Sequence, residues 1–210
     1  AGTTVALKLL TRESIDDATR LLERSRPFGE VRHPNVMRHL DLFVGPALSA
    51  EGEAAAEVGV IYSVEEWIEG ASLVESGSVA DVHAGLSHVA SVARAVAALH
   101  RFRSVDAPNG LLHRDVKPSN VRIAADGRAV LVDFGVARPF VFGDLTADVG
   151  TYRWCAPETL TGAFPVGRAI DVWGVGAVGH WVLTGEPPAL EGARSEEHTS
   201  ELQSHLNLVC

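Results

Sequence analysis

Hydrophobic positions in the first third of the chain alternate with polar ones, as they do in half-buried strands. "VALKLL" (5–10) predicts one strand, and "VMRHLDLFV" (36–44) and "VGVIYSVEEWI" (58–68) predict two more. The Ala-, Glu- and Gly-rich stretch 45–57 between the last two predicts a solvated loop. After the first strand, "SIDDATRLLERS" (14–25) has apolar residues on one helical face and Ser14 as a candidate N-cap.

A helical period dominates the second half. Residues 81–102 predict a long helix, and the apolar segment 170–183 predicts another. The first of these helices has its apolar face formed by Leu86, Val89, Ala90, Ala93, Val96, Ala97 and Leu99. Strands mostly precede helices, so the pattern predicts an α+β protein with a small β-rich lobe and a larger helical lobe.

Composition narrows the class of protein. The 210 residues carry a formal net charge of −9, which argues against a nucleic-acid-binding surface. No uninterrupted apolar run reaches the roughly 18 residues of a membrane span, so we expect no membrane contact from this segment. Cys155 and Cys210 have no metal-binding spacing, and no signal peptide opens the chain. We therefore expect a cytoplasmic protein, whose parent can still be membrane-anchored.

The cations are unevenly distributed. Of 18 basic residues, only Lys8 and Lys117 are lysines, so these two positions are candidates for a specific need for a compact ammonium group. Lys117 lies in "HRDVKPSN" (113–120), between Asp115 and Asn120, whose oxygens attract a metal ion or a proton.

Seven ordered segments resemble the signatures of a eukaryotic-type (Hanks-type) serine/threonine protein kinase catalytic domain of the bacterial kind. They are VALK (5–8), RHPNV (32–36), EEWIEG (65–70), HRDVKPSN (113–120), DFG (133–135), GTYRWCAPE (150–158) and DVWGVG (171–176). The resemblance implies a bilobal kinase fold, with a partial N-lobe and hinge at 1–70 and a partial helical C-lobe at 71–193. It also implies Mg²⁺-dependent transfer of the ATP γ-phosphoryl group to a Ser or Thr hydroxyl of a protein substrate.

The same resemblance implies roles for individual residues. Asn120 and Asp133 would bind Mg²⁺, and Asp115 would be the catalytic base that orients the substrate hydroxyl. Lys117 would neutralise charge on the migrating phosphoryl group, and Lys8 would hold the α- and β-phosphates. The two lysines of the chain are therefore the two for which this mechanism has a use.

Further residues would shape the nucleotide site. Ala6, Glu66 and Ile68 would contact the nucleotide. The helix acid that pairs with Lys8 falls on Arg24 by simple counting, and a one-residue insertion near Pro27 places Glu23 there, which is our prediction.

Four other positions have implied roles or unusual residues. His113 would be a buried scaffold residue, and Asp171 would brace the catalytic loop from the helix below it. Glu65 takes the gatekeeper position, where a carboxylate buried without a partner is costly. Arg122 replaces the leucine that usually lies under adenine, and we expect its alkyl stem to cover the ring with its head in water.

Regulation and specificity are implied by Arg114, Thr146 and Thr151. Arg114 beside the base is a ready partner for a phosphorylated activation loop, and Thr146 is the candidate acceptor, with a plain loop threonine as the alternative. Such control implies self-association for autophosphorylation. Thr151 would line the hydroxyl pocket.

Both ends depart from the family pattern. The chain begins seven residues before Lys8, too few for the family's Gly-rich loop. Residues 194–210 shift in composition, and 194–204 resemble a translated sequencing-library adapter, which predicts a non-native tail. An amphipathic helix with Leu202, Leu206 and Val209 on one face is the alternative. We expect the chain as written to be an inactive fragment.

Two other functions stay open at this point. A pseudokinase-like scaffold would bind partners without phosphotransfer, as Glu65 and Arg122 suggest, although Lys8, Asp115 and Asp133 are all present. A small-molecule phosphotransferase of related fold is disfavoured by the peptide-site segment 150–158.

Overall fold

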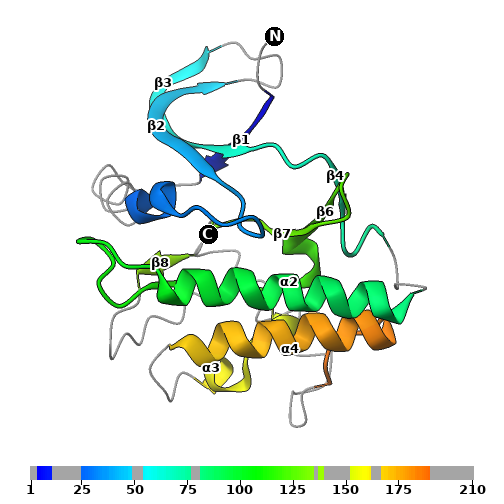
Figure 1. Ribbon diagram of the computed structural model, residues 1–210. Helices are drawn as coiled ribbons and strands as arrows, with labels where there is room; N and C mark the ends of the chain where they lie inside the picture. Colours follow the sequence, from blue (N-terminus) through cyan, green and yellow to red (C-terminus); the bar gives the residue numbers. More distant parts are fainter. Residues whose placement is uncertain are drawn as a thin grey trace.

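The computed structural model describes residues 4–10, 25–48, 54–76, 81–134, 137–139, 152–161 and 167–189. Its upper part is an antiparallel sheet with strand order β1-β3-β2 (Figure 1). The strands are β1 (Val5–Leu10), β2 (His39–Leu48) and β3 (Ala54–Glu66), and the short 3-10 helix η1 (Arg26–Glu30) lies beside the sheet. The predicted strands are confirmed. The helix predicted at 14–25 lies outside the described residues up to residue 24.

The loop predicted at 45–57 is shorter than expected. β2 and β3 continue into it as a paired hairpin, with Pro46 opposite Gly59 and Leu48 opposite Ala54. The stretch reads as a loop because Ala, Glu and Gly have low strand propensity, and backbone pairing to a neighbouring strand overrides that preference.

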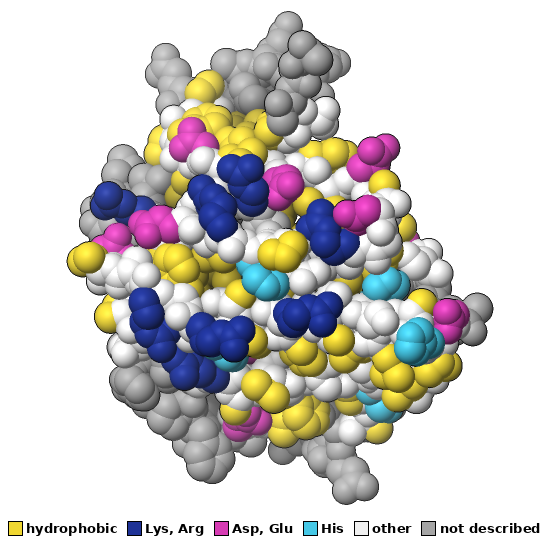
Figure 2. Space-filling view, viewed as in Figure 1, with side chains coloured by type: hydrophobic (Ala, Val, Ile, Leu, Met, Phe, Trp, Pro, Cys, Tyr) yellow, Lys and Arg dark blue, Asp and Glu magenta, His cyan; other side chains and the backbone are white. Residues whose placement is uncertain are grey.

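The two faces of β1 differ. Val5, Leu7 and Leu9 are 42–54% exposed on the outer face, whereas Ala6 and Lys8 are on the opposite, inner face. Figure 2 shows hydrophobic side chains gathered over this upper sheet. The alternation matters for function because it turns Lys8 toward the rest of the molecule.

Below this sheet lie short strands that hold the loops of the site. β4 (Gly70–Ser72), β6 (Val121–Ala124) and β7 (Ala129–Leu131) form a second sheet in the order β4-β6-β7. β5 (Leu111–Leu112) pairs with β8 (Arg138–Pro139), and the 3-10 helix η2 (Pro118–Asn120) leads directly into β6.

Helices form the lower layer (Figure 1). Both long helices were predicted: α2 (Val82–Arg101) and α4 (Arg168–Thr184), which pack on each other. The 3-10 helix η3 (Tyr152–Trp154) and the short helix α3 (Pro157–Thr161) precede α4. Asp81 caps α2 by accepting a hydrogen bond from the backbone N–H of His83 at 2.9 Å.

α2 is long and apolar enough to cross a membrane by length and composition alone. Its buried residues Val92, Ala95, Val96 and Leu99 belong to the main hydrophobic core, together with Val178 of α4. This packing accounts for the apolar character of α2, because the core helix of a globular domain meets the same criterion.

Candidate active site

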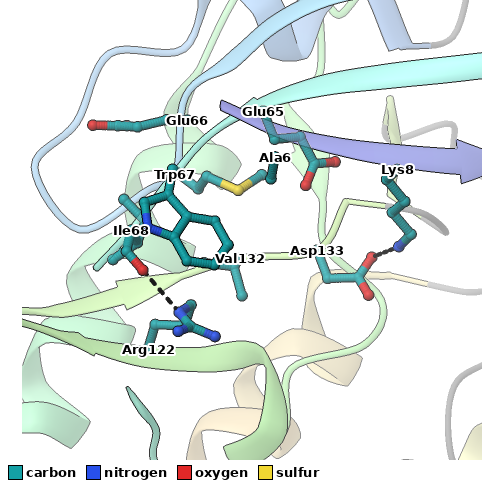
Figure 3. Close-up of a pocket in the computed structure, with 10 residues that line it drawn as sticks. Ala6, Lys8, Glu65, Glu66, Trp67, Ile68, Arg122, Val132 and Asp133 are labelled. Atoms are coloured by element: carbon teal, nitrogen blue, oxygen red, sulfur yellow. Dashed lines mark hydrogen bonds and ion pairs between the residues drawn. The ribbon is translucent and has the colours of Figure 1, made fainter. Parts of the chain in front are cut away.

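One half of the site comes from the upper sheet. In the β1–β3 pairing Lys8 lies opposite Ser63, and Ala6 lies opposite Glu65, so all four share the inner face. The Lys8 ammonium forms an ion pair with the Asp133 carboxylate, 125 residues away in sequence (Figure 3). The fold therefore joins the strand lysine to the "DFG" segment.

The other half is the loop between β5 and β6. The Lys117 ammonium lies 2.7 Å from Asp115 Oδ2, and the two side chains are only 16% and 14% exposed. Asn120 Nδ2 donates to the backbone oxygen of Asp115 at 2.8 Å and to its Oδ2 at 2.9 Å. Asp115 is thus held by two donors, each a residue that the sequence had singled out.

A backbone hydrogen bond connects the two halves. The N–H of Val132 donates to the backbone oxygen of Asn120 at 2.9 Å, and Val121 pairs with Leu131 in the β6–β7 hairpin. Asp133, two residues after the end of β7, is therefore held close to Asn120. Its φ of 67° is a left-handed conformation that is uncommon for a residue other than glycine.

The donor set at this junction fits a hard divalent cation. Asp133 offers carboxylate oxygens, and Asn120 offers its amide oxygen because its Nδ2 is used by Asp115. Among the described residues there is no group of three or more His, Cys, Asp or Glu side chains placed to hold a metal. Two protein oxygens suit Mg²⁺, which usually completes its shell with water and substrate phosphates.

Asp171 at the start of α4 braces the loop, as predicted. Its buried carboxylate accepts from the N–H of His113 at 2.9 Å, from the N–H of Arg114 at 2.7 Å, and pairs with His100 Nε2 at 2.8 Å. His113 is fully buried, and its Nε2 lies 3.1 Å from the backbone oxygen of Val132. Burial lowers the pKa of His113, with Asp171 and Asp115 opposing, which supports the scaffold role.

A pocket on the inner side of the upper sheet is lined by polar and apolar side chains (Figure 3). They are Ala6, Lys8, Met37, Glu65, Glu66, Trp67, Ile68, Arg122, Val132 and Asp133. The three predicted nucleotide contacts Ala6, Glu66 and Ile68 are therefore all at the pocket, and so is Lys8. Asn120 is not part of this lining, but its backbone oxygen accepts a hydrogen bond from the N–H of Val132, which is.

Glu65 is buried, at 8% exposure, and it is not unpaired. The Ser63 hydroxyl donates to its Oε1 at 2.9 Å. Burial raises the pKa of Glu65, while the Ser63 hydrogen bond and the charge of Lys8 lower it. The cost expected for a carboxylate at this position is thus partly offset by a neighbour on the same strand.

Arg122 differs from its prediction. Its head group is not left in water: Nε donates to the backbone oxygen of Ile68 at 3.0 Å, and a second nitrogen binds the oxygen of Gly70. Its guanidinium carbon lies 5.6 Å from the centre of the Trp67 ring. Through these two hydrogen bonds Arg122 ties the segment 67–70 to β6.

Some predicted residues lie outside the described part of the chain: Glu23, Thr146, Thr151 and the tail 194–210. Two contributors were not predicted. Ser63 could have been suspected from strand alternation, which puts it two residues before Glu65 on the same face of β3. His100 gave no sequence signal beyond its place at the end of a helix, because the carboxylate that it meets is 71 residues away.

A family model described as a protein kinase domain matches residues 1–209 of the chain. The chain belongs to the protein kinase domain family. This kinase domain is 35% identical over 208 residues to the serine/threonine-protein kinase PkaA of Streptomyces coelicolor, and 29% identical over 195 residues to PknB of Mycobacterium leprae. A calcium/calmodulin-dependent protein kinase type 1 of Caenorhabditis elegans is 28% identical over 196 residues.

These matches cover 93%, 88% and 90% of the kinase domain's chain but only 34%, 29% and 50% of the respective relatives. The chain therefore spans half or less of the length of these curated relatives. The predicted α+β fold and the family resemblance are confirmed, and membership in the family implies the use of ATP and a divalent metal ion in general. The interpretation of residues 194–210 as a translated adapter stays a prediction: the structure does not describe these residues, and the family match includes them up to residue 209.

Proposed function

We propose that this protein transfers the γ-phosphoryl group of ATP to a Ser or Thr hydroxyl of a protein substrate, with Mg²⁺ as the metal. The observation that carries the proposal is the meeting of two clusters: Asp115 with Lys117 and Asn120, and Lys8 with Asp133. Phosphoryl transfer needs an aligned carboxylate, cations on the phosphates and metal-binding oxygens, and these five residues supply them.

Each residue has a specific task in this proposal. The Asp115 carboxylate accepts a hydrogen bond from the attacking hydroxyl and takes up its proton as that oxygen bonds to the γ-phosphorus. The bond between the γ-phosphorus and the bridging oxygen of the β-phosphate breaks at the same time, and ADP leaves. Lys117, 2.7 Å from Asp115, faces the place where charge develops on the transferred group. Lys8 would bind the non-reacting phosphates, and Asp133 and Asn120 would hold the metal, which would neutralise phosphate charge.

The Ser/Thr specificity, the cytoplasmic location and self-association for autophosphorylation belong to the same proposal. They rest, respectively, on the "RDVKPSN" segment, on two cysteines whose spacing is not that of a disulfide framework or a metal site, and on Arg114 next to the base. The three relatives named above all have protein kinase names, and two of them are serine/threonine-protein kinases.

Asp115→Asn tests the proposal in the full-length protein encoded by the gene. Asparagine keeps the shape of the side chain but is a poor proton acceptor, so we expect phosphate incorporation into a generic protein substrate to fall by several orders of magnitude. Binding of Mg²⁺·ATP, measured by calorimetry, should change little. Asp126→Asn is the matched control, because Asp126 is an exposed turn residue that pairs with Arg128 away from the site.

Normal turnover by Asp115→Asn would contradict the base assignment. A wild-type protein that binds a partner protein tightly but transfers no phosphate, with or without nucleotide, would favour the pseudokinase-like scaffold instead. Phosphorylation of a small molecule with no protein substrate would favour the related phosphotransferase.

A further inference from the structure

Glu65 is the side chain of the pocket that the proposed transfer reaction does not use. It stands near the carboxyl end of β3, on the inner face that it shares with Ala6 and Lys8. Its carboxyl group points into the pocket, whereas that of the next residue, Glu66, points away (Figure 3). Glu66 Oε2 instead accepts the backbone N–H of Arg38 at 3.1 Å.

The partners of Glu65 leave one of its oxygens for a ligand. The Ser63 hydroxyl occupies Oε1. Within the described residues no other hydrogen bond to this carboxyl is present, and the cation that shares its face, Lys8, is ion-paired with Asp133. Among the described residues, Oε2 is therefore an acceptor without a donor, on a residue only 8% exposed, where a matching donor is worth most.

The chemistry of the pocket walls indicates which part of a nucleotide lies next to Glu65. The phosphates belong at Lys8 and Asp133, where the cation and the metal-binding oxygens are. The base belongs between the apolar side chains of the lining, Ala6, Met37, Ile68 and Val132, which lie with Glu66, Trp67 and Arg122 along the rest of the wall. Ala6 is directly opposite Glu65 across the two strands, so the carboxyl group adjoins the space for the base.

We propose that Glu65 determines base specificity by accepting a hydrogen bond from the exocyclic 6-amino group of adenine on Oε2, with Ser63 fixing the carboxyl group through Oε1. This inference rests on the proposed use of ATP. It makes Glu65 a specificity-determining residue: a purine that lacks the amino group leaves a buried acceptor without a partner and is rejected.

The experiment compares Mg²⁺-dependent binding of ATP with that of purine riboside 5′-triphosphate, which lacks the 6-amino group but keeps the ring nitrogens and the phosphates. The quantity measured is the ratio of the two dissociation constants in the full-length protein. Removing the negative charge of Glu65 affects the shared triphosphate equally in both ligands, so that effect cancels in the ratio.

We expect wild type to prefer ATP by about tenfold to a hundredfold, the range for a hydrogen bond to a charged group. Glu65→Met, which is apolar and of similar length, should reduce the preference to about threefold or less. The control Glu69→Gln changes an exposed acid of the same segment outside the pocket lining and should keep the wild-type ratio. If the Met variant does not fold, Glu65→Gln should still lower the ratio several-fold, because a neutral acceptor binds the amine more weakly.

Three outcomes would overturn the inference while leaving the kinase proposal intact: a wild-type ratio near one, an unchanged ratio in both Glu65 variants, or a wild-type preference for GTP over ATP. An equal loss of affinity for both ligands in Glu65→Met would show that Glu65 acts through Lys8 and the phosphates, which also contradicts base recognition. Absence of Mg²⁺-dependent binding of either nucleotide by wild type would contradict the proposed function itself.

Discussion

Gly174 in α4 supports the catalytic loop by leaving space for it. A Cβ at this position would lie 2.6 Å from Val116 Cβ and 2.7 Å from the Val116 backbone oxygen, whereas ordinary contacts begin at 3.4 Å. Val116 is buried and stands between Asp115 and Lys117, so it has little room to yield. Gly174→Ala should therefore displace the loop that contains Val116 by about 1 Å, or distort α4 by a similar amount.

Two energies oppose each other in this variant. Alanine in place of glycine stabilises a helix interior by about 1 kcal/mol, whereas overpacking a buried contact costs about 1–3 kcal/mol. We expect a net loss of up to about 2 kcal/mol in the free energy of unfolding. A ~1 Å displacement of a catalytic group reduces turnover about a hundredfold, so kcat should fall much more than the stability loss alone would explain.

Gly176→Ala is the matched control, because it makes the same change two residues further along α4, where nothing lies within 4 Å of the new Cβ. It should gain up to about 1 kcal/mol and keep full turnover. Urea denaturation and initial phosphorylation rates measure both variants. Equal stability and equal kcat for Gly174→Ala and Gly176→Ala would refute the close contact between α4 and the loop.

Three further predictions concern buried groups. In Asp171→Asn the side-chain amide would place an N–H donor against the backbone N–H donors of His113 and Arg114, so the free energy of unfolding should fall by about 1–3 kcal/mol. An unchanged urea midpoint would contradict the bracing role. Burial lowers the pKa of His39, with Asp41 opposing, so a proton binds His39 less readily in the folded than in the unfolded protein. The free energy of unfolding should therefore be independent of this group well above the unfolded pKa of 6.5, and should fall as pH drops from there through the lower folded pKa. Between pH 7.5 and 5.5 wild type should lose stability faster than His39→Gln, and parallel curves would disprove this. Burial raises the pKa of Cys155 to about 11, so its thiol should resist alkylation at pH 8, as judged by peptide mass mapping, until urea unfolds the protein; rapid labelling of the folded protein would be inconsistent with this.

The pattern along the chain was sufficient for the long elements. α2 and α4 were predicted within a few residues because their apolar positions follow the helical period, and β1 was predicted because its residues alternate. The extent of the β2–β3 hairpin was underestimated. Its outer residues have low strand propensity, and each strand is held there by the other.

The site divides in the same way. Asp115, Lys117 and Asn120 were given their roles by the resemblance too, but they lie within six residues of sequence, so local structure alone can bring them together, as the structure does. Lys8 and Asp133 were predicted to work together only through the family resemblance. Their contact is a product of the fold, which closes the 125 residues between them.

What the sequence alone determined is thus the set of candidate reacting groups and the period of each long element, since short motifs and periodicity are local properties. Tertiary structure decided the surroundings of those groups. Ala6 lies opposite Glu65 across two strands, Arg122 binds the carbonyls of Ile68 and Gly70, and Asp171 meets His100, His113 and Arg114. Strand register and helix packing fix most of these contacts, and both depend on burial summed over residues far apart in the chain, which no short stretch of sequence contains.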